Sequence, residues 1–116
     1  MKLHDVASEP FTPLHSQIAA QIRRAIAEGE ISSGARLPPV VDFAAELGVN
    51  KNTVIKALHI LRDEGLLELT RGRGIRVVGT VERGAILSKV DELIALARTL
   101  GLRREEITSI IHQRYS

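Results

Sequence analysis

The chain has 116 residues, of which 44% are apolar, 26% charged and 3% aromatic. This length fits one domain or a small domain with an appendage, and the apolar content is too high for a disordered chain. Sixteen Lys and Arg against fourteen Asp and Glu leave a net charge of +2, which excludes a strongly basic tail as the main binding device. The absence of cysteine excludes disulfides, Cys-ligated metal sites and thiol catalysis, and it fits a reducing cytoplasm.

Neither a signal peptide nor a membrane span is predicted. Residues 1–9 contain charged side chains and no apolar run. The most apolar stretch, residues 85–102, is interrupted by charged side chains and therefore indicates an amphipathic helix. We expect a cytoplasmic protein with no membrane partner, in which residues 1–12 form an N-terminal extension.

The first half of the chain predicts three helices. Thr12 and Pro13 are typical of an N-cap followed by proline at the first helical position. Apolar residues then recur every four positions up to a stop at Gly29. Pro38 and Pro39 open a short second helix, which ends at Gly48. Asn50 is the expected N-cap of a third helix with one apolar face, formed by Val54, Ala57, Leu58 and Leu61.

Two short strands are expected next, over Leu66 to Thr70 and Ile75 to Val78. The glycine-rich segment between them, residues 71–74, indicates a β-hairpin. The order helix, helix, tight turn, helix, hairpin is that of a winged helix-turn-helix, in which the third helix can enter a major groove. Residues 13–79 form this predicted domain.

Residues 13–78 resemble the DNA-binding domain of the GntR family of bacterial transcription regulators. The matching residues are Pro13-Leu14, Gln17-Ile18, Ile22, Ile26, Gly29, Gly34, Leu37-Pro38, Ala44, Leu47-Gly48-Val49, Asn52-Thr53-Val54, Ala57-Leu58, Leu61, Glu64-Gly65-Leu66, Gly72 and Gly74. The run from Asn50 to Ala57 is similar to the short YtrA-type branch, which has a small helical C-terminal segment in place of a full effector domain. The resemblance implies a DNA-binding regulator.

Four positions depart from the family's usual pattern. Pro39 stands where a capping serine is common, and Val41 where an arginine commonly touches DNA. Ile55 replaces a frequent arginine, and Lys51 replaces the proline usual in the short branch. We therefore expect the docking mode to be retained and the base-reading details to differ.

Ten residues are candidates for DNA contact. Asparagine can pair with adenine, and lysine or arginine can reach guanine or phosphate. The alternatives are helix capping and a solvated basic face for the helix, and an ordinary exposed turn for the hairpin tip; Ile55 could pack on a thymine methyl group or on the protein. The candidates are Arg36, Asn50, Lys51, Asn52, Thr53, Ile55, Lys56, Arg71, Gly72 and Arg73.

No catalytic or metal-binding pattern is evident. The four histidines lack metal-ligand spacing, and no nucleotide-binding loop, nucleophile elbow or zinc-protease motif occurs. We predict no enzyme, no metal site and no cofactor. A site for an unidentified small-molecule effector between the C-terminal helices of a dimer stays open.

The C-terminal segment, residues 80–116, predicts two helices separated by Gly101. Its apolar residues follow a heptad-like spacing on a face too broad for two short helices to bury on each other. They could pack back on the winged helix, but pairing with a second copy is the favoured interpretation. The expected dimer interface comprises Ile86, Val90, Leu93, Ile94, Ala97, Leu100, Ile107, Ile110 and Ile111.

Together these patterns predict a mostly α protein with a small β-hairpin, built as an N-terminal winged helix-turn-helix and a C-terminal two-helix dimerisation segment. Its expected partners are double-stranded DNA and a second copy of itself. The expected function is a homodimeric repressor that binds a (pseudo)palindromic operator. The alternative is a winged-helix protein-interaction module without specific DNA binding.

Overall fold

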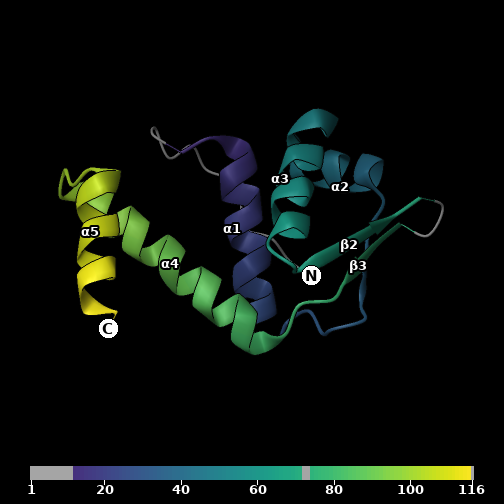
Figure 1. Ribbon diagram of the computed structural model, residues 1–116. Helices are drawn as coiled ribbons and strands as arrows, with labels where there is room; N and C mark the ends of the chain where they lie inside the picture. Colours follow the sequence, from purple (N-terminus) through teal and green to yellow (C-terminus); the bar gives the residue numbers. More distant parts are fainter. Residues whose placement is uncertain (1–11, 72–73, 116) are drawn as a thin grey trace.

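The computed structural model describes residues 12–71 and 74–115 (Figure 1). The helices and strands of this part lie in the predicted order. They are α1 (Leu14–Ala27), β1 (Arg36–Leu37), α2 (Val40–Leu47), α3 (Lys51–Asp63), β2 (Leu67–Thr70), β3 (Gly74–Val77), α4 (Val81–Thr99) and α5 (Arg104–Arg114). The mostly helical class and the winged helix-turn-helix architecture are thus confirmed.

One core holds the winged helix together. The isoleucines that repeat every four residues along α1 pack on the apolar face of α3, and α3 in turn contacts α2 and β2. Ile18, Ile22, Val54 and Leu61 are wholly inaccessible to solvent. Burial of each such side chain contributes about 1.5–3 kcal/mol, so the first three helices form one body that holds α3 in place.

The helix boundaries follow the turn residues closely. Gly48 ends α2 with a φ of +68°, a left-handed conformation that glycine adopts without strain. This sharp turn lets α3 begin three residues later. The expected cap at Thr12 is wrong: α1 begins at Leu14 with Pro13 as its N-cap. The Thr12 carbonyl instead accepts a hydrogen bond from Gln17 Nε2 at 2.8 Å.

The sheet has one more strand than the predicted hairpin. β2 and β3 pair as expected, but β1 adds to the outer side of β3, which gives the antiparallel order β1-β3-β2. Arg36 pairs with Arg76 and Leu37 with Ile75. Two residues are too few to show strand periodicity, so the sequence alone does not reveal β1.

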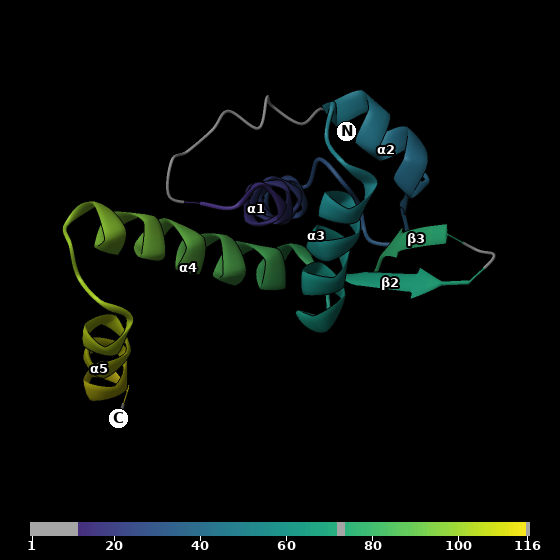
Figure 2. The ribbon, with the colours of Figure 1, turned by 90° about the horizontal axis from the view of Figure 1, so that it is seen from above.

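Helix α4 follows the hairpin and packs across α1, which is seen nearly end-on in Figure 2. Leu87 on its inner face packs on the main core. Beyond this contact α4 carries α5 to the end of the molecule opposite the hairpin, so the two C-terminal helices form an arm (Figure 2). The C-terminal segment therefore does both things considered for it: one face packs on the winged helix and the other stays exposed.

The exposed face includes most of the residues expected at a dimer interface. Ile86 and Leu100 are 67% and 66% exposed. Val90, Leu93, Ile94, Ile110 and Ile111 are also exposed, and Ile107 is half-buried. Ala97 is different, because it is only 5% exposed within one chain. Its place in the interface stays a prediction, and the side chain is already covered within one chain.

Among the described residues, none of the helices is long and apolar enough to span a bilayer.

Candidate nucleic-acid interface

Helix α3 begins with a run of polar side chains at the surface. Asn50 caps the helix, since its Oδ1 accepts a hydrogen bond from the backbone N–H of Asn52 at 2.8 Å. Lys51, Asn52 and Lys56 are exposed. The helix dipole places a partial positive charge at this end, so its first two turns present both hydrogen-bonding groups and positive charge.

The buried face of α3 determines which side chains point outward. Val54, Ala57, Leu58 and Leu61 are buried against the core, and successive residues in a helix are about 100° apart. Asn52 and Lys56 therefore lie opposite the core. His59 follows Lys56 by three residues and Asn52 by seven, and it is also exposed. We did not predict His59 as a contact residue, although its spacing from Asn52 is visible in the sequence.

Thr53 and Ile55 occupy the borders of this face. Both are half-buried, so part of each side chain contacts the protein and part faces solvent. The partial exposure of Ile55 is compatible with both interpretations, packing on the protein and contact with a base. Both side chains are shorter than those of Lys51 and Lys56, which are exposed.

The hairpin formed by β2 and β3 projects away from the helices and forms the wing (Figure 1). Thr70 pairs with Gly74 at its tip, and Gly74 has a φ of +79°. A three-residue hairpin loop commonly requires a residue in this left-handed region. Arg71 is exposed at the start of the loop. The predicted contact residues Gly72 and Arg73 lie outside the described residues.

Arg36 lies on β1, at one edge of the sheet, whereas Arg71 follows β2 at the other edge. The exposed face of the three strands carries Glu68, Arg76 and Arg36 in one row. Arg76 Nη2 contacts Glu68 Oε1 at 2.8 Å, so the charge of Arg76 is partly neutralised. The structure thus brings the α3 candidates together on one helix, and it places Arg36 on β1 and Arg71 in the hairpin loop that follows β2.

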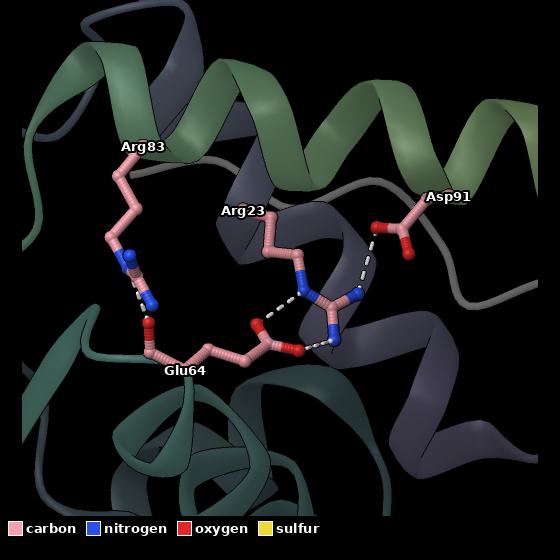
Figure 3. Close-up of polar contacts among 4 residues, drawn as sticks. All are labelled: Arg23, Glu64, Arg83 and Asp91. Atoms are coloured by element: carbon pink, nitrogen blue, oxygen red, sulfur yellow. Dashed lines mark hydrogen bonds and ion pairs between the residues drawn. The ribbon is translucent and has the colours of Figure 1, made fainter. Parts of the chain in front are cut away.

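A buried arginine on α1, Arg23, connects the end of α3 to α4 in the C-terminal arm. The guanidinium of Arg23 on α1 donates to both carboxylate oxygens of Glu64, at the end of α3, over 2.7 Å each. Its remaining nitrogen, Nη1, donates to Asp91 Oδ2 on α4, also over 2.7 Å (Figure 3). Nearby, Arg83 donates from Nε to the Glu64 carbonyl. The sequence gives no signal for this cluster, because the partners lie 41 and 68 residues apart.

The cluster has an unequal charge balance. Burial works against the charge of Arg23, but the hydrogen bond to Glu64 and the charges of both carboxylates outweigh it, and the pKa of the guanidinium is raised. Burial also raises the pKa of the Asp91 carboxyl above its ordinary value, and the adjacent Arg23 charge does not fully offset this effect. Two carboxylates thus share one buried cation.

No metal-binding group of three or more His, Asp or Glu side chains occurs in the part of the chain that the structure describes.

Comparison with known proteins agrees with this architecture. The family described as "Bacterial regulatory proteins, gntR family" matches residues 14–77. HTH-type transcriptional regulator Rv1152 of Mycobacterium tuberculosis is 33% identical over 96 residues, which cover 81% of this chain and 78% of that protein. HTH-type transcriptional repressor YtrA of Bacillus subtilis is 40% identical over 63 residues, 54% of this chain and 48% of the repressor. The match to regulator RB1450 of Rhizobium meliloti spans only 26% of that relative.

Solved structures show the same arrangement. YtrA from Sulfolobus acidocaldarius, a GntR-family transcription factor, has a TM-score of 0.63 and 35% identity over 81% of this chain and 99% of its own. The DNA-binding domain of AraR, solved in complex with operator ORX1, has a TM-score of 0.60 and 26% identity over 67% of this chain and 99% of its own. The YtrA matches in sequence and in structure support the short branch.

Proposed function

Since this chain belongs to the GntR family of bacterial regulatory proteins and carries its DNA-binding domain, we propose that it acts as a homodimeric repressor. In this proposal, α3 enters the major groove of a (pseudo)palindromic operator and the wing contacts the neighbouring backbone or minor groove. No catalytic step is involved.

The observation that carries the proposal is the exposed start of α3. Lys51, Asn52 and Lys56 project from the two turns nearest the helix N-terminus, which is the end that reaches base edges in helix-turn-helix proteins. Asn52 can form two hydrogen bonds with adenine, and the lysines can reach guanine or phosphate. Asn50 is exposed and contributes mainly by capping the helix.

The wing supplies contacts that position the protein. Arg71 at the wing tip and Arg36 at the outer strand are exposed, and arginine suits both phosphate and a narrow minor groove. We assign Gly72 and Arg73 to the same contact from the sequence. Residues 50–76 hold six Lys and Arg against three Asp and Glu, a local charge of +3 that exceeds the net charge of the whole chain.

The arm supports a dimer. The Cα radius of gyration is 14.9 Å, above the roughly 13 Å expected for a compact domain of this length, because α4 and α5 extend away from the core. Several isoleucines and leucines on both helices are exposed, and exposed apolar side chains in such number are typical of a protein interface. A second copy is the natural occupant, since a two-fold interface pairs the same surface with itself.

A two-fold dimer places two copies of α3 on one side of the duplex. The two half-sites then lie about one helical turn of DNA apart, or a multiple of it. Because YtrA of Bacillus subtilis is named a repressor, we expect binding to lower transcription. Such a regulator acts on chromosomal DNA, which places it in the cytoplasm.

The proposal is tested by titrating a duplex, selected from a random pool by the full chain, with a variant that combines Lys56→Ala and Arg71→Ala. Each lost phosphate contact lowers the slope of log affinity against log salt by about 0.9. Affinity should fall at all salt concentrations and the slope should decrease. Lys89→Ala on α4, which removes an exposed charge far from the wing, should change neither.

Unchanged binding of the double variant would show that this face does not contact DNA. Weak binding of the parent chain without sequence preference would instead favour a protein-interaction module, in which the wing arginines face an acidic partner.

A further inference from the structure

Asp91 is not required to neutralise Arg23. The bidentate pair with Glu64 already balances the guanidinium charge and occupies two of its nitrogens. Asp91 adds a second carboxylate, so the three side chains carry a net charge of −1. Asp91 is therefore not needed for charge balance, yet the buried, planar guanidinium of Arg23 holds it at 2.7 Å. This contact fixes where α4 lies.

Helix α4 contacts the winged helix at two places along its length. At the first, Gly84 lies directly against α1: a Cβ placed on it would be 3.0 Å from the backbone nitrogen of Ala27. Arg83, beside it, donates to the Glu64 carbonyl. Asp91 follows seven residues later on the same helix face, about 10 Å along the axis, and reaches Arg23.

Beyond Asp91 the contact fades. Ala95 is one turn further along the same face and is exposed. Arg98 approaches Thr12 Oγ1 at 3.5 Å in an exposed position, at the outer limit of a hydrogen bond. Among the polar contacts described for residues 12–71 and 74–115, that of Asp91 is therefore the last strong one between α4 and the body of the winged helix before the arm extends outward (Figure 2).

Small rotations of α4 are amplified at the end of the arm. Thr99 lies fifteen residues beyond Gly84, or about 22 Å at 1.5 Å per residue. A pivot of about 10° at Gly84 moves Thr99 by about 4 Å, and successive base pairs are about 3.4 Å apart. If α4 were loosely held, the distance between the two α3 helices of a dimer would vary by about one base-pair step.

We propose that Asp91 is a positioning residue, which fixes the direction of α4 relative to the winged helix and so determines the half-site spacing that the dimer accepts. The effect on spacing depends on the proposed dimeric, DNA-binding function. The effect on α4 does not, because it is a property of one chain.

The position of α4 is tested with spin labels. Because the chain has no cysteine, Glu46→Cys on α2 and Thr99→Cys on α4, both exposed, give two defined labels. Double electron–electron resonance is recorded on the full chain diluted with unlabelled chain, so that only the distance within one chain is measured. The matched control for Asp91→Ala is Glu92→Ala, which removes a carboxylate paired only with Lys89 among the described ion pairs.

The parent and Glu92→Ala should give the same narrow distance distribution, and Asp91→Ala should broaden it by about 4 Å, as the pivot estimate requires. A distribution as narrow as that of the parent would overturn the proposal. So would the loss of helical circular dichroism in Asp91→Ala, because Asp91 would then be needed for folding rather than for direction.

The spacing claim is tested with duplexes that carry the selected half-sites at separations changed by one base pair at a time. The parent and Glu92→Ala should lose about tenfold in affinity for each step, or about 1.4 kcal/mol, whereas Asp91→Ala should lose less than about threefold. An equally steep profile for Asp91→Ala would contradict the role in spacing. If the parent itself binds a single half-site as tightly as a pair, the dimeric function fails, and the label distances still decide the role of Asp91 in α4.

Discussion

Gly84 on α4 lies so close to Ala27 on α1 that a Cβ at this position would be 3.0 Å from the Ala27 nitrogen and 3.0 Å from Ile26 Cγ2. The two helices meet here without an intervening side chain. Glycine usually weakens a helix interior, so its presence in the first turns of α4 is explained by this close approach. The contact fixes where the C-terminal arm leaves the winged helix.

Gly84→Leu should therefore separate α4 from α1. The larger side chain gains helix propensity of about 1 kcal/mol but cannot fit beside Ile26, and overpacking of this kind costs about 1–3 kcal/mol or more. We expect a net loss of about 1–2 kcal/mol in the free energy of unfolding, measured by urea denaturation. Ala95→Leu, an exposed position on the same helix face, should leave it within about 0.5 kcal/mol.

Asn50 allows the capping and DNA-binding contributions to be separated. Asn50→Asp keeps an oxygen that can accept from the Asn52 N–H, and aspartate caps as well as asparagine, so thermal stability should not change. The new negative charge faces the phosphates and should lower operator affinity. Asn50→Ala should lose about 1 kcal/mol of stability.

Thr80→Ala provides the control for this comparison, since Thr80 caps α4 through its contact with the Arg83 N–H. It should lose a similar stability without weakening binding to a single half-site. Equal affinity of Asn50→Asp and the parent would place Asn50 outside the DNA interface.

Leu93→Asp should convert the dimer into folded monomers. Leu93 is exposed in one chain, so the charge is tolerated by the monomer but is buried without a partner in the dimer, which is costly. Light scattering after size exclusion should report the mass of one chain, and circular dichroism should remain helical. Thr99→Asp, exposed at the end of α4, is the matched control and should stay dimeric.

Ala97→Asp gives the opposite result because this side chain is buried within the chain itself. It should lower the stability of the monomer, seen as a lower unfolding midpoint. A stable Ala97→Asp monomer would support the predicted place of Ala97 in the dimer interface. An intact Leu93→Asp dimer would show that the second copy binds elsewhere.

The pH dependence of stability should report on Asp91. Its pKa is raised in the folded chain, chiefly by burial, above the ordinary value of 3.8. Protonation of this carboxyl therefore favours folding: its contribution is fully present below pH 3.8 and is lost as pH rises through the folded pKa. Asp91→Asn, which does not titrate, should gain stability relative to the parent as pH rises from about 3 to neutrality.

Urea unfolding of both proteins across this range measures the difference. Glu92→Gln, at an exposed neighbouring carboxylate, should show no comparable trend. A gain for Asp91→Asn that shrinks with rising pH would mean that Arg23 stabilises the Asp91 charge more than burial opposes it.

The sequence predicted the elements whose signals are local. Gly48 ended α2, Asn50 capped α3, and the glycine-rich segment between two short strands identified the wing. The features that it missed depend on tertiary contacts. β1 is defined only by its pairing with β3, and the burial of Ala97 depends on how the chain folds around α4.

In the candidate site, too, some features have a local sequence signal and others depend on tertiary contacts. The outward positions of Asn52 and Lys56 follow from helical periodicity, and the same periodicity gives the outward position of His59. The link between Arg23 and Asp91 could not be predicted, because Arg23 is one of two adjacent arginines on α1, Asp91 is one of several charged residues on α4, and nothing local distinguishes either. Only the packing of α4 on α1 brings these two residues together.

The most direct test of the central claim is selection of bound duplexes from a random pool with the full chain and with Asn52→Ala. The parent should enrich inverted repeats whose half-sites lie about one helical turn apart, or a multiple of it. Asn52→Ala should keep the repeat and its spacing but relax the preference at one symmetric pair of positions, at a cost of about 1–3 kcal/mol. A pool that stays random with the parent chain would contradict sequence-specific reading by α3.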